Sequence, residues 1–276
     1  MRAEDYSAQE PFTEIGAAYH AKIMGLAGTV PTVERQWGDD PYQSAALYPA
    51  EAPRGDVLCL IHGGGWTNGY KEWMAFCAPA LTARGITVAS LGYRLAPRNV
   101  WPACFEDVAE GLREVRRMAP EHGADPERIA VSGHSAGGHL AALLALRTDW
   151  QRPRSLPADV VKAALPISGT YRFGEGSGLS IRPRFLGDPS LGNEERASPM
   201  THLRGDAPAF LVAWGEKDFP HLRAQAEGFA TALAGAGAPV ETLVIEGADH
   251  LGASYASAEP QGAWVQAADA LLQGLD

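Results

Sequence analysis

The stretch RIAVSGHSAGGHLAALLALRTDW, residues 128–150, carries the strongest structural signal in the chain. Residues 128–135 form a short apolar run that is typical of a buried strand, and residues 137–149, rich in small and apolar types, favour a helix. Between them stands Ser135, with a glycine two positions away on either side. Glycines let a chain turn sharply because they bring no Cβ into a crowded turn. We therefore predict that Ser135 lies on a tight strand–turn–helix junction with its hydroxyl pointing outward.

The same alternation of strand and helix continues on both sides of this stretch. Apolar runs predict strands at 56–64, 86–93, 160–169, 208–215 and 240–247, and helices over 71–85, 102–121, 219–235 and about 259–273. These strands are continuous apolar runs, as expected for strands buried on both faces. Residues 32–38 and 42–50 are predicted to form an antiparallel pair at the sheet edge. The prediction is an α/β fold: a mostly parallel, twisted sheet with helices on both faces.

Length and composition indicate one domain. The chain has 276 residues and is 46% hydrophobic, so it can bury a sizeable core. Because it contains neither a linker nor a fixed repeat, we expect a single domain over residues 1–276. Two segments interrupt the alternation: residues 1–30, with a weakly amphipathic helix near 13–27, and residues 170–206. Long irregular segments within a compact domain are usually functional, so both are candidate lid or cap segments.

Charge and cysteine content narrow the expected partners. The formal net charge is −10 and no block of Lys and Arg occurs, so neither nucleic acid nor a membrane is an expected partner. The N-terminus lacks the apolar core of a signal peptide, and we expect a cytoplasmic protein. Three scattered cysteines predict no disulfide framework and no metal site. No cofactor is expected, and monomer and homodimer remain alternatives.

A reactive serine needs a base and an acid, and both have candidates at strand ends. A serine hydroxyl is a weak nucleophile until a base removes its proton, and His250, in the loop GADHLG after a predicted strand, is the candidate. An acid must orient that histidine; Asp218 follows another strand, with Glu216 as the alternative. The carboxyl ends of parallel strands lie at one edge of a sheet. Ser135, Asp218 and His250 are therefore predicted to meet there as a catalytic triad.

The motif HGGGW at 62–66 supplies a second candidate element of the site. Acyl transfer places negative charge on a carbonyl oxygen, which preorganised N–H groups must meet. Gly64, Gly65 and Ala136 are the predicted donors of this oxyanion hole. A phosphate-binding loop, the alternative, lacks the G-K-[ST] ending that such loops carry.

Aromatic residues near the strand ends are the tentative substrate pocket. They are Trp66, Tyr70, Tyr171, Phe185 and Phe219. Together they indicate a small or medium apolar ligand. The alternative for each of them is ordinary packing in the core.

Three segments resemble a known branch of enzymes: HGGGW (62–66), YRLAPRNVWPACFEDV (93–108) and DPERIAVSGHSAGGHLAA (125–142). They resemble the esterases and lipases of the α/β-hydrolase fold related to hormone-sensitive lipase. His134, where those relatives usually have Asp, and GEKDFPHLRAQAEGFATAL (215–233) are similar to the arylformamidase-like neighbours. The resemblance covers about residues 30–275. Gly65 favours a carboxylesterase, because arylformamidases often have a bulkier residue there.

The resemblance implies a serine carboxylesterase that hydrolyses small to medium apolar or aryl esters through an acyl-enzyme. An arylformamidase acting on N-formylkynurenine-type amides is the alternative, since it would use the same residues. A non-catalytic ligand-binding homologue is the remaining alternative. Such homologues usually lack a triad residue, whereas all three candidates are present here.

Overall fold

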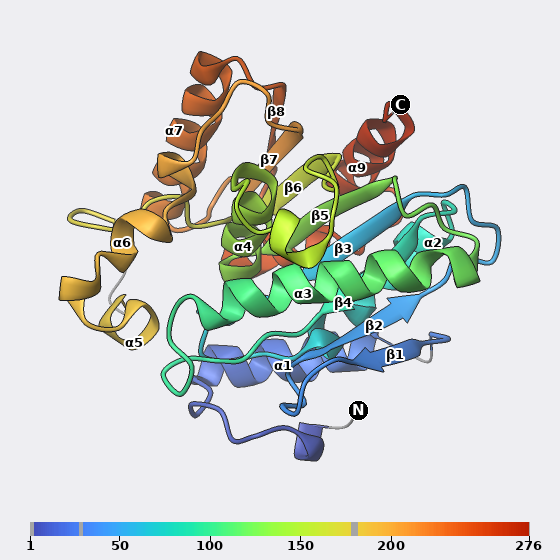
Figure 1. Ribbon diagram of the computed structural model, residues 1–276, viewed down its shortest axis with the longest axis horizontal. Helices are drawn as coiled ribbons and strands as arrows, with labels where there is room; N and C mark the ends of the chain where they lie inside the picture. Colours follow the sequence, from blue (N-terminus) through green and yellow to red (C-terminus); the bar gives the residue numbers. More distant parts are fainter. Residues whose placement is uncertain (1–2, 28–29, 178–181, 276) are drawn as a thin grey trace.

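A computed structural model describes residues 3–27, 30–177 and 182–275 of the chain. Its centre is one eight-stranded sheet with the order β1-β2-β4-β3-β5-β6-β7-β8 (Figure 1). The strands are β1 (Val33–Gln36), β2 (Ser44–Tyr48), β3 (Val57–Ile61), β4 (Thr87–Leu91), β5 (Ile129–His134), β6 (Ala163–Ile167), β7 (Ala209–Gly215) and β8 (Val240–Ile245). The mostly parallel sheet expected from the sequence is thereby confirmed.

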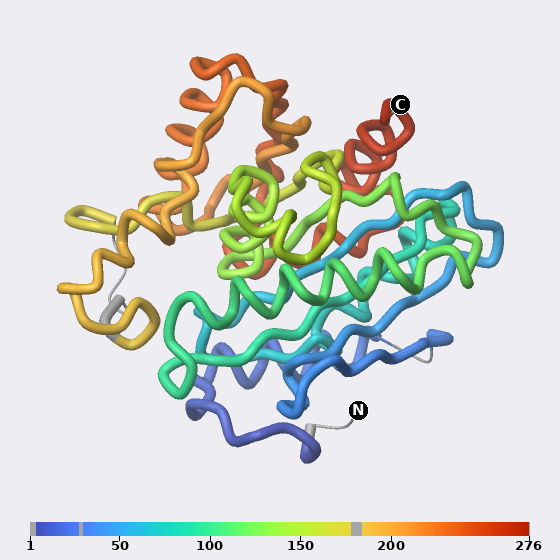
Figure 2. Tube along the Cα trace, viewed as in Figure 1, coloured from blue at the N-terminus to red at the C-terminus, as the bar shows by residue number. Residues whose placement is uncertain are grey.

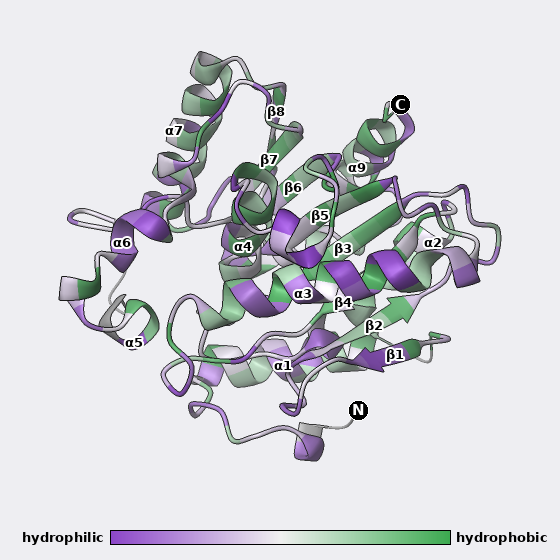
Figure 3. Ribbon diagram, viewed as in Figure 1, coloured by the Kyte–Doolittle hydropathy of each residue, from purple (hydrophilic) through white to green (hydrophobic). Residues whose placement is uncertain are grey.

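The sheet is parallel from β4 to β8 and antiparallel at one edge. β3 pairs in parallel with both of its neighbours, so that Cys59 lies beside Ala89 on β4 and Val131 on β5. β1 and β2 form the predicted antiparallel pair, with Val33 opposite Leu47. β2 then pairs antiparallel with β4. The central strands are buried on both faces, which explains their continuous apolar sequence; Figure 3 shows them mostly in green.

Helices cover both faces of the sheet, and alternate residues of each strand face opposite layers. The helices are α1 (Glu14–Leu26), α2 (Ala78–Thr82), α3 (Ala103–Met118), α4 (Ala136–Leu146), α5 (Arg182–Leu186), α6 (Asn193–Arg196), α7 (Pro220–Ala236), α8 (His250–Ala256) and α9 (Ala263–Gln273). Cys59 and Ile61 of β3 belong to the core under α3, α4 and α7. Leu58 and Leu60 belong to the core under α1, α2, α8 and α9.

Most predicted helices differ from the structure by a few residues at their ends, and two segments differ in kind. Residues 71–85 form a 3-10 helix, η2 (Lys71–Cys77), followed by the short α2 rather than one helix. Pro79 explains the break, because proline lacks an N–H and fits only the first turn of a helix. The loop expected at His250 is the first turn of α8, and Asp249 caps it by accepting from the N–H of Gly252 at 2.7 Å.

α1 and the insert between β6 and β7 pack on opposite layers, whereas Tyr6, earlier in the N-terminal segment, belongs to the same core as the insert. The N-terminal segment lies against η2 and α8, where the buried Tyr19 hydroxyl is 2.8 Å from Ser254 Oγ. The insert between β6 and β7 carries α5 and α6 and projects at one end of the molecule, in yellow and orange in Figure 2. It is held by His139 Nε2, 2.6 Å from the Ala197 carbonyl. Both candidate lid segments include residues outside the described ranges, 1–2 and 28–29 in one and 178–181 in the other.

Among the described residues, none of the helices combines the length and the apolar character that crossing a bilayer demands.

Candidate active site

Ser135 occupies the predicted turn between β5 and α4. Its backbone has φ +57° and ψ −116°, a conformation that side-chain-bearing residues rarely adopt. Its N–H donates to the Ile167 carbonyl on β6 at 2.9 Å, which fixes the turn to the sheet. A Cβ on Gly137 would lie 1.9 Å from the Ile61 carbonyl oxygen, and one on Gly133 would lie 2.5 Å from it. The two glycines are therefore a steric requirement of this turn.

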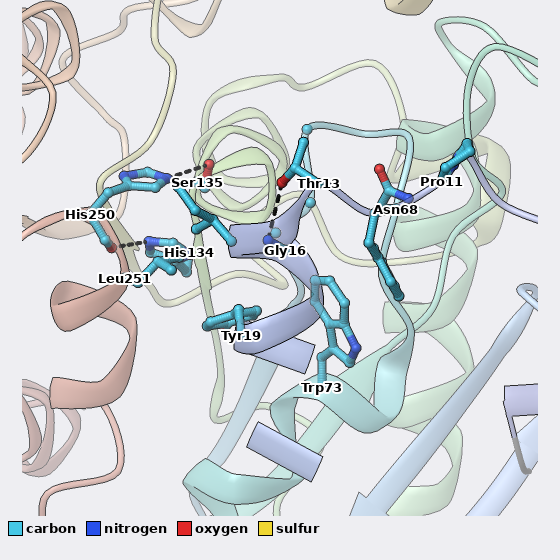
Figure 4. A pocket seen from close by; sticks show the side chains of 15 residues that line it. Pro11, Thr13, Gly16, Tyr19, Asn68, Trp73, His134, Ser135, His250 and Leu251 are labelled. Atoms are coloured by element: carbon cyan, nitrogen blue, oxygen red, sulfur yellow. Dashed lines mark hydrogen bonds between the residues drawn. The ribbon is translucent and has the colours of Figure 1, made fainter. Parts of the chain in front are cut away.

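His250 and Asp218 lie in line with Ser135. The Nε2 atom of His250 is 3.1 Å from Ser135 Oγ, and its Nδ1 atom is 2.9 Å from Asp218 Oδ1. A carboxylate only accepts, so Nδ1 carries the proton and Nε2 offers its lone pair to the serine hydroxyl. Figure 4 shows the His250 ring directed at Ser135. The three predicted residues thus form one hydrogen-bonded series at the carboxyl ends of β5, β7 and β8.

Asp218 is buried and held as an anion. Burial opposes its ionisation, but the hydrogen bond and charge of His250 outweigh that effect, so the pKa of Asp218 lies below its usual value. Its Oδ1 also accepts from the N–H of Phe219 at 2.7 Å. Glu216, the alternative acid, instead accepts from the N–H of Gly247 at 2.8 Å. This contact stabilises the turn after β8 and leaves the histidine to Asp218.

The glycine loop after β3 lines the same cavity as Ser135. Gly64 and Gly65 have φ of +103° and +61°, and a Cβ on Gly64 would lie 2.1 Å from the Asn68 carbonyl oxygen. No backbone carbonyl among the described residues accepts from the N–H of either glycine. Ala136 is the first residue of α4, where a backbone N–H has no acceptor within its own helix. Among the described residues, none of the three N–H groups has a backbone acceptor.

A cavity of about 230 Å³ opens beside Ser135. The glycine loop is part of its lining. His134 and His250 lie on one side of it, and Thr13, Gly16 and Tyr19 of the N-terminal segment face them (Figure 4). The lining residues outside the triad and the glycine loop are Pro11, Phe12, Thr13, Ile15, Gly16, Tyr19, Asn68, Trp73, His134 and Leu251. They include no Lys, Arg, Asp or Glu. The cavity is therefore mainly apolar and carries no fixed charge.

None of the five predicted pocket aromatics is among the residues that line this cavity. Trp66 and Phe185 stack on each other at 4.3 Å, and Tyr171 stacks on Phe229 at 4.1 Å, all in the core beneath the insert. Tyr70 packs in a cluster with Tyr6 and Tyr42. Phe219 is 53% exposed and lies outside the lining, 5.1 Å from the His250 ring. Ordinary packing, the alternative weighed for each, accounts for the first four.

The cavity-lining residues of the N-terminal segment were not singled out from the sequence. Phe12 and Tyr19 pack around Trp73, and Trp73 Nε1 donates to His20 Nδ1 at 2.9 Å. Gln9 exchanges two hydrogen bonds with the backbone of Gly69, at 3.0 and 2.9 Å. The weak helical signal over 13–27 predicted the helix, but its pattern does not reveal which face meets the cavity.

Known proteins with similar sequences or structures are hydrolases. Residues 58–253 match a protein family described as alpha/beta hydrolase fold. The chain is 34% identical over 204 residues to the esterase LipQ of Mycobacterium tuberculosis, which covers 68% of this chain and 48% of LipQ. It is 28% identical over 222 residues to the kynurenine formamidase of Salmo salar, covering 77% and 71% of the two chains.

A solved structure gives the same result for nearly the whole chain. The thermostable carboxylesterase EstE1, cloned from a metagenomic library, superposes with a TM-score of 0.76 at 26% identity, covering 95% of this chain and 97% of EstE1. The match to LipQ and to the related LipM covers less of this chain. The chain spans only about half of the length of these two proteins.

Proposed function

The chain belongs to the family described as alpha/beta hydrolase fold, and from this premise we propose that it hydrolyses carboxylic esters with Ser135 as nucleophile. The observation that carries the proposal is the hydrogen-bonded series from Ser135 through His250 to Asp218. This series opens onto a cavity without charged lining side chains, and the lining includes Gly64 and Gly65, whose N–H groups have no backbone acceptor among the described residues. The names of LipQ and EstE1 support the same class of reaction.

The proposed reaction has two steps that share one base. Ser135 Oγ bonds to the ester carbonyl carbon while His250 Nε2 takes the hydroxyl proton. The resulting oxyanion accepts hydrogen bonds from the N–H groups of Gly64, Gly65 and Ala136. When the C–O bond breaks, the alcohol leaves with the proton from His250. Water then attacks the acyl carbon while His250 takes its proton; the bond to Ser135 Oγ breaks, His250 returns the proton to Oγ, and the carboxylic acid leaves.

The cavity favours small, uncharged substrates. Its volume of about 230 Å³ suits a short acyl or aryl group, and its apolar lining offers nothing to a charged one. N-Formylkynurenine carries an α-carboxylate and an α-ammonium group, and the lining has no charged side chain to pair with either. The formamidase alternative shares the triad, so turnover has to separate it from the esterase.

The test compares p-nitrophenyl esters of short acids with N-formylkynurenine, using Ser135→Ala as the blank. We expect ester cleavage in the wild type and a loss of about 10⁴-fold or more in kcat in the variant. A preference for the formamide would establish the alternative function. Turnover of neither substrate above the Ser135→Ala background would contradict the proposal.

A further inference from the structure

His134 lies between the three parts of the proposed site without belonging to the triad. It is the last residue of β5, directly before Ser135, and only 3% of it is exposed. On one side a Cβ added to Gly63 would lie 3.3 Å from its Nδ1. On the other side its ring packs against that of His250, with 4.5 Å between the ring centroids. The His134 side chain therefore lies against both the glycine loop and the His250 ring.

The hydrogen bonding of His134 defines its tautomer. Its Nε2 is 2.8 Å from the backbone carbonyl oxygen of His250 (Figure 4). A carbonyl oxygen only accepts, so Nε2 carries the proton and donates it. Burial, reinforced by the charge of His250, lowers the pKa of His134 to about 3. The His134 ring is therefore neutral near pH 7.

We propose that His134 is a positioning residue for the base: its Nε2–H holds the His250 backbone at a fixed distance from Ser135. His250 is the first residue of α8, where no preceding helical turn restrains it. The His134 hydrogen bond supplies that restraint from β5, the same strand that carries the nucleophile. This inference rests on the proposed function, in which His250 takes the proton of Ser135.

Neutrality is part of the proposed role. In each step His250 becomes positively charged, with the His134 ring packed against it. A second cation there would oppose proton transfer, whereas a neutral ring that donates to the carbonyl does not. Among the described residues, the titratable side chains that hydrogen-bond to the His250 ring or pack against it are Asp218, which is an anion, and His134 itself.

The first test compares two substitutions of His134 that differ in whether the new side chain has an N–H donor. His134→Gln keeps an amide N–H that can reach the carbonyl, and His134→Leu keeps similar bulk without a donor. Titration with a fluorophosphonate to completion counts the active sites, so that kcat is expressed per functional serine. We expect His134→Leu to lower this kcat about 10- to 100-fold with KM within about 3-fold, because a small displacement of a catalytic group has effects of this size. We expect His134→Gln to stay within about 3-fold of the wild type.

Each result bears on the proposal. A merely structural role would reduce the number of titrated sites or the melting temperature while kcat per site stays unchanged, and this result would overturn the proposal. Equal losses in both variants would also overturn it, because the donor would then not matter. Wild-type turnover over the Ser135→Ala blank is measured in the same series. A failure of the esterase function is thus seen separately.

The second test uses the wild type and does not depend on folding of a variant. With ¹⁵N-labelled histidine, the NMR shifts of His134 report which ring nitrogen carries the proton. We expect the Nε2–H tautomer at pH 7 and no second proton down to about pH 5, in line with a pKa of about 3. An Nδ1–H tautomer, or protonation of both nitrogens at pH 6, would overturn the proposal whatever the activity.

Discussion

At Gly137 the chain leaves less space than one methyl group needs. The Ile61 carbonyl oxygen would lie 1.9 Å from a Cβ at this position. This oxygen belongs to the backbone of β3 and the Cβ would be fixed to the backbone of α4, so neither can rotate away. Gly228 on α7 is the opposite case, since a Cβ there would meet nothing within 4 Å. The same residue type thus has a steric role in one helix and none in the other.

This contrast gives a prediction at the residue scale. Gly137→Ala should lower the free energy of unfolding by about 3 kcal/mol, because the added methyl forces β3 and α4 apart. Gly228→Ala should raise it by about 0.5 to 1 kcal/mol, because alanine loses less backbone entropy in a helix. Urea unfolding monitored by circular dichroism measures both. Equal stability of the two variants would contradict the packing seen at the turn.

At the scale of elements, the outer wall of the cavity comes from the first turns of α1 and the residues that lead into it. Phe12 and Tyr19 pack around Trp73 of η2 and face the glycine loop across the cavity. Because the side chains of this wall belong to a segment outside the sheet, substitutions in it should leave the turn at Ser135 unchanged. The size of the acyl group accepted should therefore depend on this segment.

The matching prediction concerns chain length. Phe12→Ala should raise kcat/KM for a p-nitrophenyl octanoate relative to the butyrate by about 10-fold, since the removed ring leaves room for more methylenes. Phe219→Ala is the control, because this ring is also near His250 but outside the cavity lining. We expect its octanoate-to-butyrate ratio to equal that of the wild type. Equal shifts in both variants would count against the N-terminal wall.

Elements also show where sequence reasoning succeeds and where it ends. The buried strands are unambiguous because both of their faces are apolar, and the turn at Ser135 is unambiguous because its glycines have no other reason to be there. Pro79 divides the helix predicted over 71–85. The predicted pocket aromatics do not line the cavity beside Ser135. The sequence could not show this, because an aromatic side chain such as Trp66 has the same signature in a core and beside a ligand. Only packing decides, and packing depends on residues far apart in the chain.

On the scale of the whole molecule, three buried histidines make folding sensitive to acid. Burial lowers the pKa of His62 and His139 to about 4 and that of His134 to about 3. Once unfolded, each side chain returns to its ordinary pKa of about 6.5. Between these values the unfolded chain binds protons that the folded chain refuses, so the folded state loses stability as the pH falls.

The stability loss should be steep and measurable. Near pH 5, these histidines should bind roughly three protons from the solution on unfolding. The free energy of unfolding should therefore fall by about 4 kcal/mol for each pH unit that the pH is lowered. Urea titrations at pH 7, 6 and 5 give the slope, and His139→Gln should reduce it by about one proton. A free energy of unfolding that stays constant between pH 7 and pH 5 would contradict the buried, neutral state of these rings.

The hydrogen bond between Tyr19 and Ser254 joins residues 235 positions apart, and this has a consequence for synthesis. Synthesis proceeds from the N-terminus, so the outer wall of the cavity is made long before the helix that receives it. Until α8 has emerged, the Tyr19 hydroxyl lacks the Ser254 hydroxyl that it contacts, and His250, at the start of that helix, has not been made. A nascent chain that ends before α8 therefore holds the proposed nucleophile without its base. The proposed hydrolytic competence arrives in one event, when α8 docks against α1.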